Sequence, residues 1–207
     1  ATARIIAERQ GFRGVRWQKM TDNNGGETPS SVGSYIIWQQ PHPIYFAELL
    51  YRIKNDEETL NRYRKIVDQT AEFMVSFVYY DPQLKRYTLP GVMPGQEQYD
   101  PATTFNPTYE LAYWRWALET AQLWRQRQEL PRNNEWDSVL KALSPLPCKD
   151  GLYLAAESAP DSYTNPLFME DHPSVLGAYG MLPATAGLDT TVMRHTLEYI
   201  SENWQRD

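Results

Sequence analysis

Residues 89–116 read LPGVMPGQEQYDPATTFNPTYELAYWRW, a proline-rich loop that runs into a strongly helical segment. Pro-Gly pairs at 90–91 and 94–95 interrupt regular structure in the first half. Asn106 followed by Pro107 predicts a helix start, with Asn as the N-cap and Pro at the first helical position. Apolar residues then recur at helical spacing: Leu111, Trp114, Leu118, Ala121 and Trp124.

Glu97 is the candidate reactive group of this loop, where it lies among Gln96, Gln98 and Tyr99. A loop that enters a rigid helix is a common location for such groups, because the helix fixes what the loop presents. The apolar and prolyl neighbours are expected to desolvate the Glu97 carboxyl and so to favour its protonated form. The alternative is an ordinary glutamate on a surface loop.

Composition limits the classes of function. The chain has 207 residues, 42% hydrophobic content and a net charge of −6, which is typical of a globular protein with a sizeable core. We expect no nucleic-acid partner, because no basic run is present to follow phosphates. We expect a soluble protein, since no apolar run approaches the roughly 18 residues of a membrane span. The single Cys148 excludes an intrachain disulfide framework.

Aromatic residues are in excess, with seven Trp and 14 Tyr. Flat aromatic faces suit stacking on sugar rings, although core packing explains most aromatic residues in most proteins. The first residue is Ala rather than Met, so we expect a chain that was processed or cut from a longer one. No signal peptide is visible. Periplasmic or extracellular location is slightly favoured over the cytoplasm.

Helical periodicity dominates the chain and predicts an all-α protein. The expected helices cover residues 3–10, 43–54, 56–80, 107–128, 135–143, 173–181 and 190–205. Long loops at 12–42, 81–106 and 144–172 alternate with short connections, and loops of this length are usually functional. Helices linked in this way form stacked antiparallel hairpins whose long loops emerge at one end. We therefore expect an (α/α) toroid, about half of a six-hairpin barrel, with residues 1–207 as a single domain within a larger catalytic domain.

Caps and stripes define these helices more closely. Gly11 is expected to end the first helix. Asn55, Asn134 and Asp189 are expected to cap the helices that follow them. The helix over 43–54 carries an apolar stripe on one face: Phe46, Leu49, Leu50 and Ile53.

Two segments resemble a known family. Residues 11–17, GFRGVRW, are similar to the GY-x-GA-R-[FW] segment of glycoside hydrolase family 65. Residues 92–99 and 105–109 resemble its GPDEY and NN-x-YTN segments. The chain thus resembles the six-hairpin (α/α)6-barrel glycosidases, nearest to family 65, a group of trehalose- and maltose-type hydrolases and phosphorylases. The resemblance implies that Glu97 is the general acid and that the rest of the barrel, with the family's base, lies outside these residues.

The sequence also departs from the family pattern. Gln96 stands where the family has Asp before its Glu, and Glu170-Asp171 stands where the family has a Lys-Gln sugar contact. Residues 18–21 replace the acidic or Ser residues that follow the family's first Trp. The identity of the substrate therefore does not transfer.

Glycoside hydrolysis needs a protonated carboxyl for the leaving oxygen and a second carboxylate that activates water or attacks the sugar. Glu97 is the expected acid. Glu157, Asp161 and Asp171 on the third long loop are weak candidates for the base, and each also fits a turn or a cap. Inversion is expected, which requires the two carboxyl groups to lie roughly 6.5–9.5 Å apart.

Substrate contacts are expected from residues that offer stacking faces or hydrogen bonds to hydroxyl groups. The candidates are Arg16, Trp17, Lys19, Trp38, Gln39, Gln40, His42 and Tyr99. No metal or other cofactor is expected, because the three His residues are not at zinc-binding spacing and no phosphate-binding glycine motif occurs.

Two other functions stay open. A polysaccharide lyase on a similar toroid would use Tyr99 or His42 as the base and Arg16 to neutralise a uronate. A non-catalytic helical module that binds carbohydrate is the third reading. In each case half a barrel would expose a broad apolar edge, so we expect self-association or a missing complement.

Overall fold

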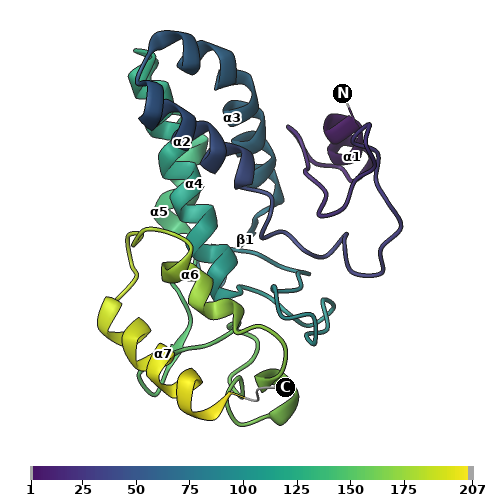
Figure 1. Cartoon of the computed structure of the whole chain (residues 1–207), viewed down its shortest axis with the longest axis vertical. Helices are drawn as coiled ribbons and strands as arrows, with labels where there is room; N and C mark the ends of the chain where they lie inside the picture. Colours follow the sequence, from purple (N-terminus) through teal and green to yellow (C-terminus); the bar gives the residue numbers. More distant parts are fainter. Residues whose placement is uncertain (1, 205–207) are drawn as a thin grey trace. The chain divides into compact units, whose positions relative to one another are not determined.

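The computed structural model describes residues 2–204 and is mostly helical (Figure 1). Its helices are α1 (Thr2–Arg9), α2 (His42–Lys54), α3 (Glu57–Phe77), α4 (Thr108–Arg127), α5 (Asn134–Ala142), α6 (Gly177–Gly180) and α7 (Thr190–Asn203), with 3-10 turns η1 (Pro166–Met169) and η2 (Ser174–Leu176). The predicted predominance of helices is confirmed. None of the described helices is long and apolar enough to cross a membrane.

Two small antiparallel hairpins were missed, so the all-α prediction is wrong in detail. Strands β1 (Tyr79–Asp81) and β2 (Arg86–Thr88) pair, and so do β3 (Cys148–Lys149) and β4 (Leu152–Tyr153). Strand β2 and the second hairpin lie in segments expected to be long loops, whereas Tyr79 and Tyr80 of β1 lie at the end of the helix expected over 56–80. Strands this short carry too little alternation to be recognised against the helical pattern.

The chain divides into two compact units. The first comprises the described residues up to Gly33, residues 39–78 and residues 114–143. The second comprises residues 34–38, 79–113 and the described residues from Ser144 onward. Helix α4 begins in the second unit and ends in the first. The expected single domain and toroid stay predictions.

The core of the first unit is aromatic. Trp114 and Trp124 of α4 and Trp136 of α5 are fully or almost fully buried. The indole of Trp114 donates to the carbonyl of Met74 at 3.0 Å, and the ring of Phe77 lies 5.9 Å from that of Trp114. The indoles of Trp124 and Trp136 donate to Glu48 at 2.8 Å and to Glu72 at 3.1 Å. Each of the three buried indole N–H groups thus finds an acceptor, which is the usual condition for burying Trp.

Helix α2 does not bury the stripe expected of it. Phe46, Leu49, Leu50 and Ile53 are exposed by 57, 41, 36 and 80%, while Ile44, Ala47 and Glu48 are buried. The helix packs against α3 within the first unit (Figure 1) through this other face. The periodicity predicted the helix correctly. An apolar stripe in the sequence does not, however, say which face of the helix packs against another segment.

Most helix ends were predicted to within one or two residues, but the helix expected over 56–80 ends at Phe77, and the helix expected over 173–181 is the 3-10 turn η2 followed by the short α6. Gly11 adopts a left-handed φ of 81° after α1, and the Asp189 carboxylate accepts from the amides of Thr191 and Val192. Asn55, however, is the left-handed C-cap of α2, and Asp56 caps α3. Asn133 rather than Asn134 caps α5. Adjacent Asn and Asp residues compete for the same cap, and tertiary packing selects one of them.

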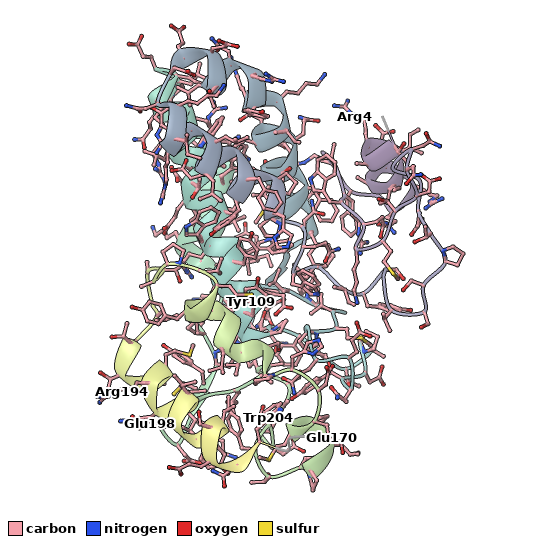
Figure 2. The ribbon with its side chains drawn as sticks, viewed as in Figure 1. Arg4, Tyr109, Glu170, Arg194, Glu198 and Trp204 are labelled. Atoms are coloured by element: carbon pink, nitrogen blue, oxygen red, sulfur yellow. The ribbon has the colours of Figure 1, made fainter. Side chains whose placement is uncertain are left out.

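In the second unit, the N-terminal end of α4 packs on α6. A Cβ on Gly177 would lie 2.9 Å from the Tyr109 ring, so only glycine fits at this approach, and Figure 2 labels Tyr109. Helix α7 packs on β4 and η2, and the amide of Tyr153 donates to the Thr196 hydroxyl at 2.9 Å. Arg194 and Glu198 lie on the outer side of α7, where Figure 2 shows them together.

Candidate functional site

Glu97 lies at the exposed turn of a loop that is otherwise buried. We call residues 92–99 the Glu97 loop. Val92, Met93, Pro94 and Gln96 are buried, whereas Glu97 is exposed. The expected desolvation of Glu97 by its neighbours is therefore wrong: those neighbours turn inward and leave its carboxyl toward solvent.

Hydrogen bonds of Gln96 and Glu97 fix the Glu97 loop. The Gln96 side-chain amide donates to the carbonyl of Phe168 at 2.7 Å, and its oxygen accepts from the Ser174 hydroxyl at 3.4 Å. The backbone amide of Glu97 donates to Oδ2 of Asp171 at 3.3 Å. Gln96 stands where the family has Asp, and its side chain is held by hydrogen bonds to Phe168 and Ser174.

Asp171, a candidate base, lies beside Glu97 but binds its backbone. Its φ is 58°, and its other carboxylate oxygen lies 2.5 Å from Nδ1 of His172. The indole of Trp204 donates to the Asp171 carbonyl at 2.9 Å, and Figure 2 labels Trp204 at the end of α7. Asp171 therefore has the geometry of a residue that positions Glu97.

Tyr99 closes the Glu97 loop on its C-terminal side. Its ring stacks on Phe168 with centroids 4.2 Å apart and planes 14° apart. Tyr99 is 3% exposed, and burial raises the pKa of its hydroxyl, which keeps that hydroxyl protonated. A buried stacked ring is not available to stack on a sugar in this conformation.

Glu157, the other carboxylate named as a base, is paired. It forms an ion pair with Arg86 of β2, and its Oε2 accepts from the Asn106 amide at 2.8 Å. Asn106 itself does not cap α4. It is fully buried with a φ of 52°, and its Oδ1 accepts from the amide of Leu89 at 2.8 Å while its Nδ2 also donates to Ser144 at 3.2 Å. Asn106 thereby joins three segments of the second unit.

Most of the residues expected to contact sugar belong to the first unit. Two of them, Gln39 and Gln40, bind the backbone of residues 15–17. Oε1 of Gln40 accepts from the amide of Trp17 at 2.7 Å, and its Nε2 donates to the carbonyl of Val15 at 2.8 Å. Nε2 of Gln39 donates to the carbonyl of Trp17 at 3.1 Å. The Trp17 indole donates to Thr70 at 2.9 Å. Gln39 and Gln40 thus hold residues 15–17 in place.

The remaining candidates differ in burial. Arg16 is 5% exposed, donates to Gln10 at 2.5 Å, and has a pKa lowered by burial. His42 begins α2, and burial lowers its pKa, which favours the neutral imidazole near pH 7. Lys19 and Trp38 are half-buried, and Trp38 belongs to the second unit. Substrate contacts by these residues stay predictions.

Glu110 is the functional candidate that the sequence reasoning missed. It lies in the first turn of α4, is 0% exposed, and neither carboxylate oxygen accepts a hydrogen bond. The amide groups of Gly95 and of Glu110 itself face the carboxyl without closing such a bond. Burial raises the Glu110 pKa to about 8, against the smaller effect of those two amides. A sequence signal existed, because Glu110 interrupts a segment that is apolar on every side.

Within residues 2–204, no three His, Cys, Asp or Glu side chains come together as a metal site. The two acidic side chains that stand out around the Glu97 loop are the exposed Glu97 and the buried Glu110.

Comparison with solved structures identifies the fold. The chain is similar to a structure provisionally described as a kojibiose phosphorylase from the human microbiome, with a TM-score of 0.76 and 13% sequence identity. The match covers 97% of this chain and 35% of that one, so the chain spans about a third of that protein's length. The neighbour is of the family 65 type, which agrees with the resemblance at the level of the fold. No family model matches the chain, and no curated protein matches it.

Proposed function

We propose that this chain is part of an enzyme that cleaves glycosidic bonds, with Glu97 as the general acid. The observation that carries the proposal is an exposed carboxylate on a fixed loop, in which the Glu97 backbone amide donates to Asp171 and the side-chain amide of the preceding Gln96 donates to the carbonyl of Phe168. The fold is that of a structure described as a phosphorylase of the disaccharide kojibiose. A fixed loop with an exposed acid meets the need for precise positioning of a proton donor.

In the proposed reaction, the protonated Glu97 carboxyl donates its proton to the oxygen of the leaving group as the glycosidic bond breaks. Water attacks the anomeric carbon from the opposite face, loses its proton to a second carboxylate that acts as the base, and the anomeric configuration inverts. A bound sugar would cover Glu97 and exclude bulk water from the proton transfer. We propose that Asp171 positions Glu97, and that the base is neither Asp171 nor Glu157.

The experiment is a screen of α- and β-linked disaccharides and oligosaccharides with the natural protein that contains this sequence. Glu97→Gln is expected to lower turnover about 10²–10⁴-fold, the usual contribution of a general acid. Glu198→Gln on the outer side of α7 removes the same charge and is the matched control. Unchanged turnover in Glu97→Gln would move the acid to another residue.

Phosphorolysis is the second candidate function, and the description of the structural neighbour favours it. Running the same screen with and without inorganic phosphate separates the two. Hydrolysis gives free sugars at a rate independent of phosphate, whereas phosphorolysis gives a sugar phosphate only when phosphate is present. Unsaturated products from uronate polymers would indicate a lyase, and binding without turnover would indicate a carbohydrate-binding module.

We also propose that the helices form part of an (α/α) toroid. The exposed apolar stripe of α2 supports this, because four large apolar side chains at i, i+3, i+4 and i+7 form a face suited to another helix. Sedimentation of the 207-residue chain tests the proposal. A compact monomer at all concentrations would contradict it, and self-association would support it.

A further inference from the structure

Glu110 presents a buried acid that the proposed reaction does not use. It is 0% exposed, and neither of its carboxylate oxygens has a hydrogen-bond donor. A carboxylate withdrawn from water without partners strongly favours its neutral form. The first turn of a helix favours the ionised form, so burial here outweighs the effect of the helix dipole.

The Gly95 backbone of the Glu97 loop faces this carboxyl. Besides burial, the groups that shift the Glu110 pKa are the backbone amides of Gly95 and Glu110. No charged side chain of residues 2–204 contributes to this shift. Gly95 also lies against Ser174, because a Cβ added to it would come within 3.3 Å of the Ser174 Cβ. The backbone just before Gln96 is thus enclosed between α4 and η2.

We propose that Glu110 is a positioning residue that holds the Glu97 loop closed in its neutral, protonated state and releases the loop when it ionises. A neutral carboxyl can remain buried against Gly95. A charged carboxylate requires water or a donor, and movement of the turn at residues 94–96 away from α4 would let water reach it. Since Gln96 connects that turn to Phe168 and Ser174, the movement would displace Glu97.

The effect of this movement on catalysis depends on the proposed function of Glu97; the coupling between Glu110 and the Glu97 loop does not. The coupling between Glu110 and the loop can be measured without substrate, so failure of one does not entail failure of the other. Amide exchange of peptides covering residues 92–99 reports the loop, and the thermal midpoint reports the stability of the fold.

The test compares the wild-type chain with Glu110→Gln, a neutral side chain of the same shape, between pH 5 and pH 9. Glu119→Gln, an exposed change on the same helix, is the matched control. Relative to Glu110→Gln, the wild-type midpoint is expected to fall by about 5–10 °C across this range. Exchange in residues 92–99 is expected to rise at least about tenfold more in wild type, and Glu119→Gln is expected to follow wild type.

Parallel pH profiles of wild type and Glu110→Gln would overturn the proposal. If Glu110→Gln does not fold, infrared spectra of the wild-type chain decide instead, because a protonated carboxyl has its own carbonyl band. Persistence of that band at pH 7, with loss near pH 8 alongside faster exchange in residues 92–99, is the expected result. Loss of the band below pH 6, or loss without faster exchange, would also overturn the proposal.

Discussion

Among the described residues, each unit of the molecule buries one glutamate. The two carboxyl groups differ in whether they have hydrogen-bond partners. Glu48 of α2 is 1% exposed, and its carboxylate accepts from Arg127 at 2.6 Å and from the Trp124 indole at 2.8 Å. Arg127 donates a second bond at 3.1 Å, and Arg52 donates one at 2.9 Å. Glu110 of α4 is buried to the same degree and accepts none.

The difference shows that burial alone does not set the charge of a carboxyl. Burial opposes ionisation of Glu48, but its bonds to Arg127, Arg52 and Trp124 outweigh it and lower the pKa. For Glu110 the effect of burial prevails, and the pKa rises to about 8. A partnered acid serves as a fixed structural charge, whereas an unpartnered acid can respond to pH near neutrality.

The largest expected effect comes from removing the partner of Glu48. Arg127→Met is expected to lower the free energy of unfolding by about 3–5 kcal/mol, because it leaves a buried carboxylate short of its main counterion. Chemical denaturation measures this. The double variant Glu48→Gln/Arg127→Met removes both charges and should be more stable than the single variant. Additive losses would mean that the pair is not coupled.

The next effect concerns Asn106, a buried polar side chain of the second unit that, unlike Glu110, has hydrogen-bond partners. Asn106→Ala is expected to cost about 2–4 kcal/mol, since the buried amide of Leu89 loses its acceptor and Ala is strained at a φ of 52°. Asn106→Gly removes the same side chain without the strain. Urea unfolding should therefore rank wild type above Gly and Gly above Ala, and equal losses in the two variants would exclude a contribution from strain.

The two buried acids should respond to pH at opposite ends of the scale. The folded pKa of Glu110 is raised, so its contribution is fully present below the unfolded value of 4.5 and is lost as pH rises toward 8, by about 2–4 kcal/mol. The folded pKa of Glu48 is lowered, so its contribution is present above 4.5 and is lost as pH falls. Stability profiles of Glu110→Gln and Glu48→Gln should thus differ from wild type in the alkaline and acid limbs respectively. Deviations in the same limb would refute the contrast.

Asp171 is expected to have a smaller effect, confined to catalysis. Asp171→Gly keeps the left-handed backbone but removes the acceptor of the Glu97 amide, and we expect kcat/KM to fall about tenfold, or about 1.4 kcal/mol. Asp171→Asn retains an oxygen that can accept this bond and should lose less. If the two variants are equally impaired, the carboxylate charge rather than the hydrogen bond is what matters.

The smallest change in stability is expected at the exposed stripe of α2. Ile53→Lys should alter the free energy of unfolding by less than about 0.5 kcal/mol, because Ile53 is 80% exposed. It should nevertheless reduce self-association in sedimentation experiments. Leu167→Lys, at a site 63% exposed in the second unit, should leave association unchanged. An effect of both substitutions alike would indicate a nonspecific response to charge.

Local signals predicted the helices well, because caps and periodicity act within a few residues. Asp189 caps α7 as expected, and Gly11 ends α1 as expected. The misplaced caps at Asn55 and Asn134 involve neighbouring residues of equal capping ability. Asn106 shows the limit of such reasoning: its side chain binds Leu89, Ser144 and Glu157, which lie far away along the chain.

The site was harder to predict, because its side chains also contact residues that lie far away along the chain. A loop with a carboxylate before a helix drew attention to Glu97, and the structure shows how its backbone is fixed. Gln39, Gln40 and Trp17 suggested sugar contacts by composition, yet their hydrogen bonds hold the first loop. Glu110 was passed over because an acid in the first turn of a helix is favourable for local reasons alone.

By itself, the sequence determined the helical character, the positions of the helices and the presentation of Glu97 on a proline-interrupted loop, because all three depend on interactions between near neighbours. Only the tertiary structure decided which face of α2 is buried and which buried glutamate finds a partner. Burial and pairing are set by segments distant in sequence: α4 supplies Arg127 and Trp124 to Glu48, and only backbone amides face Glu110. The charge state of an acid follows from that enclosure.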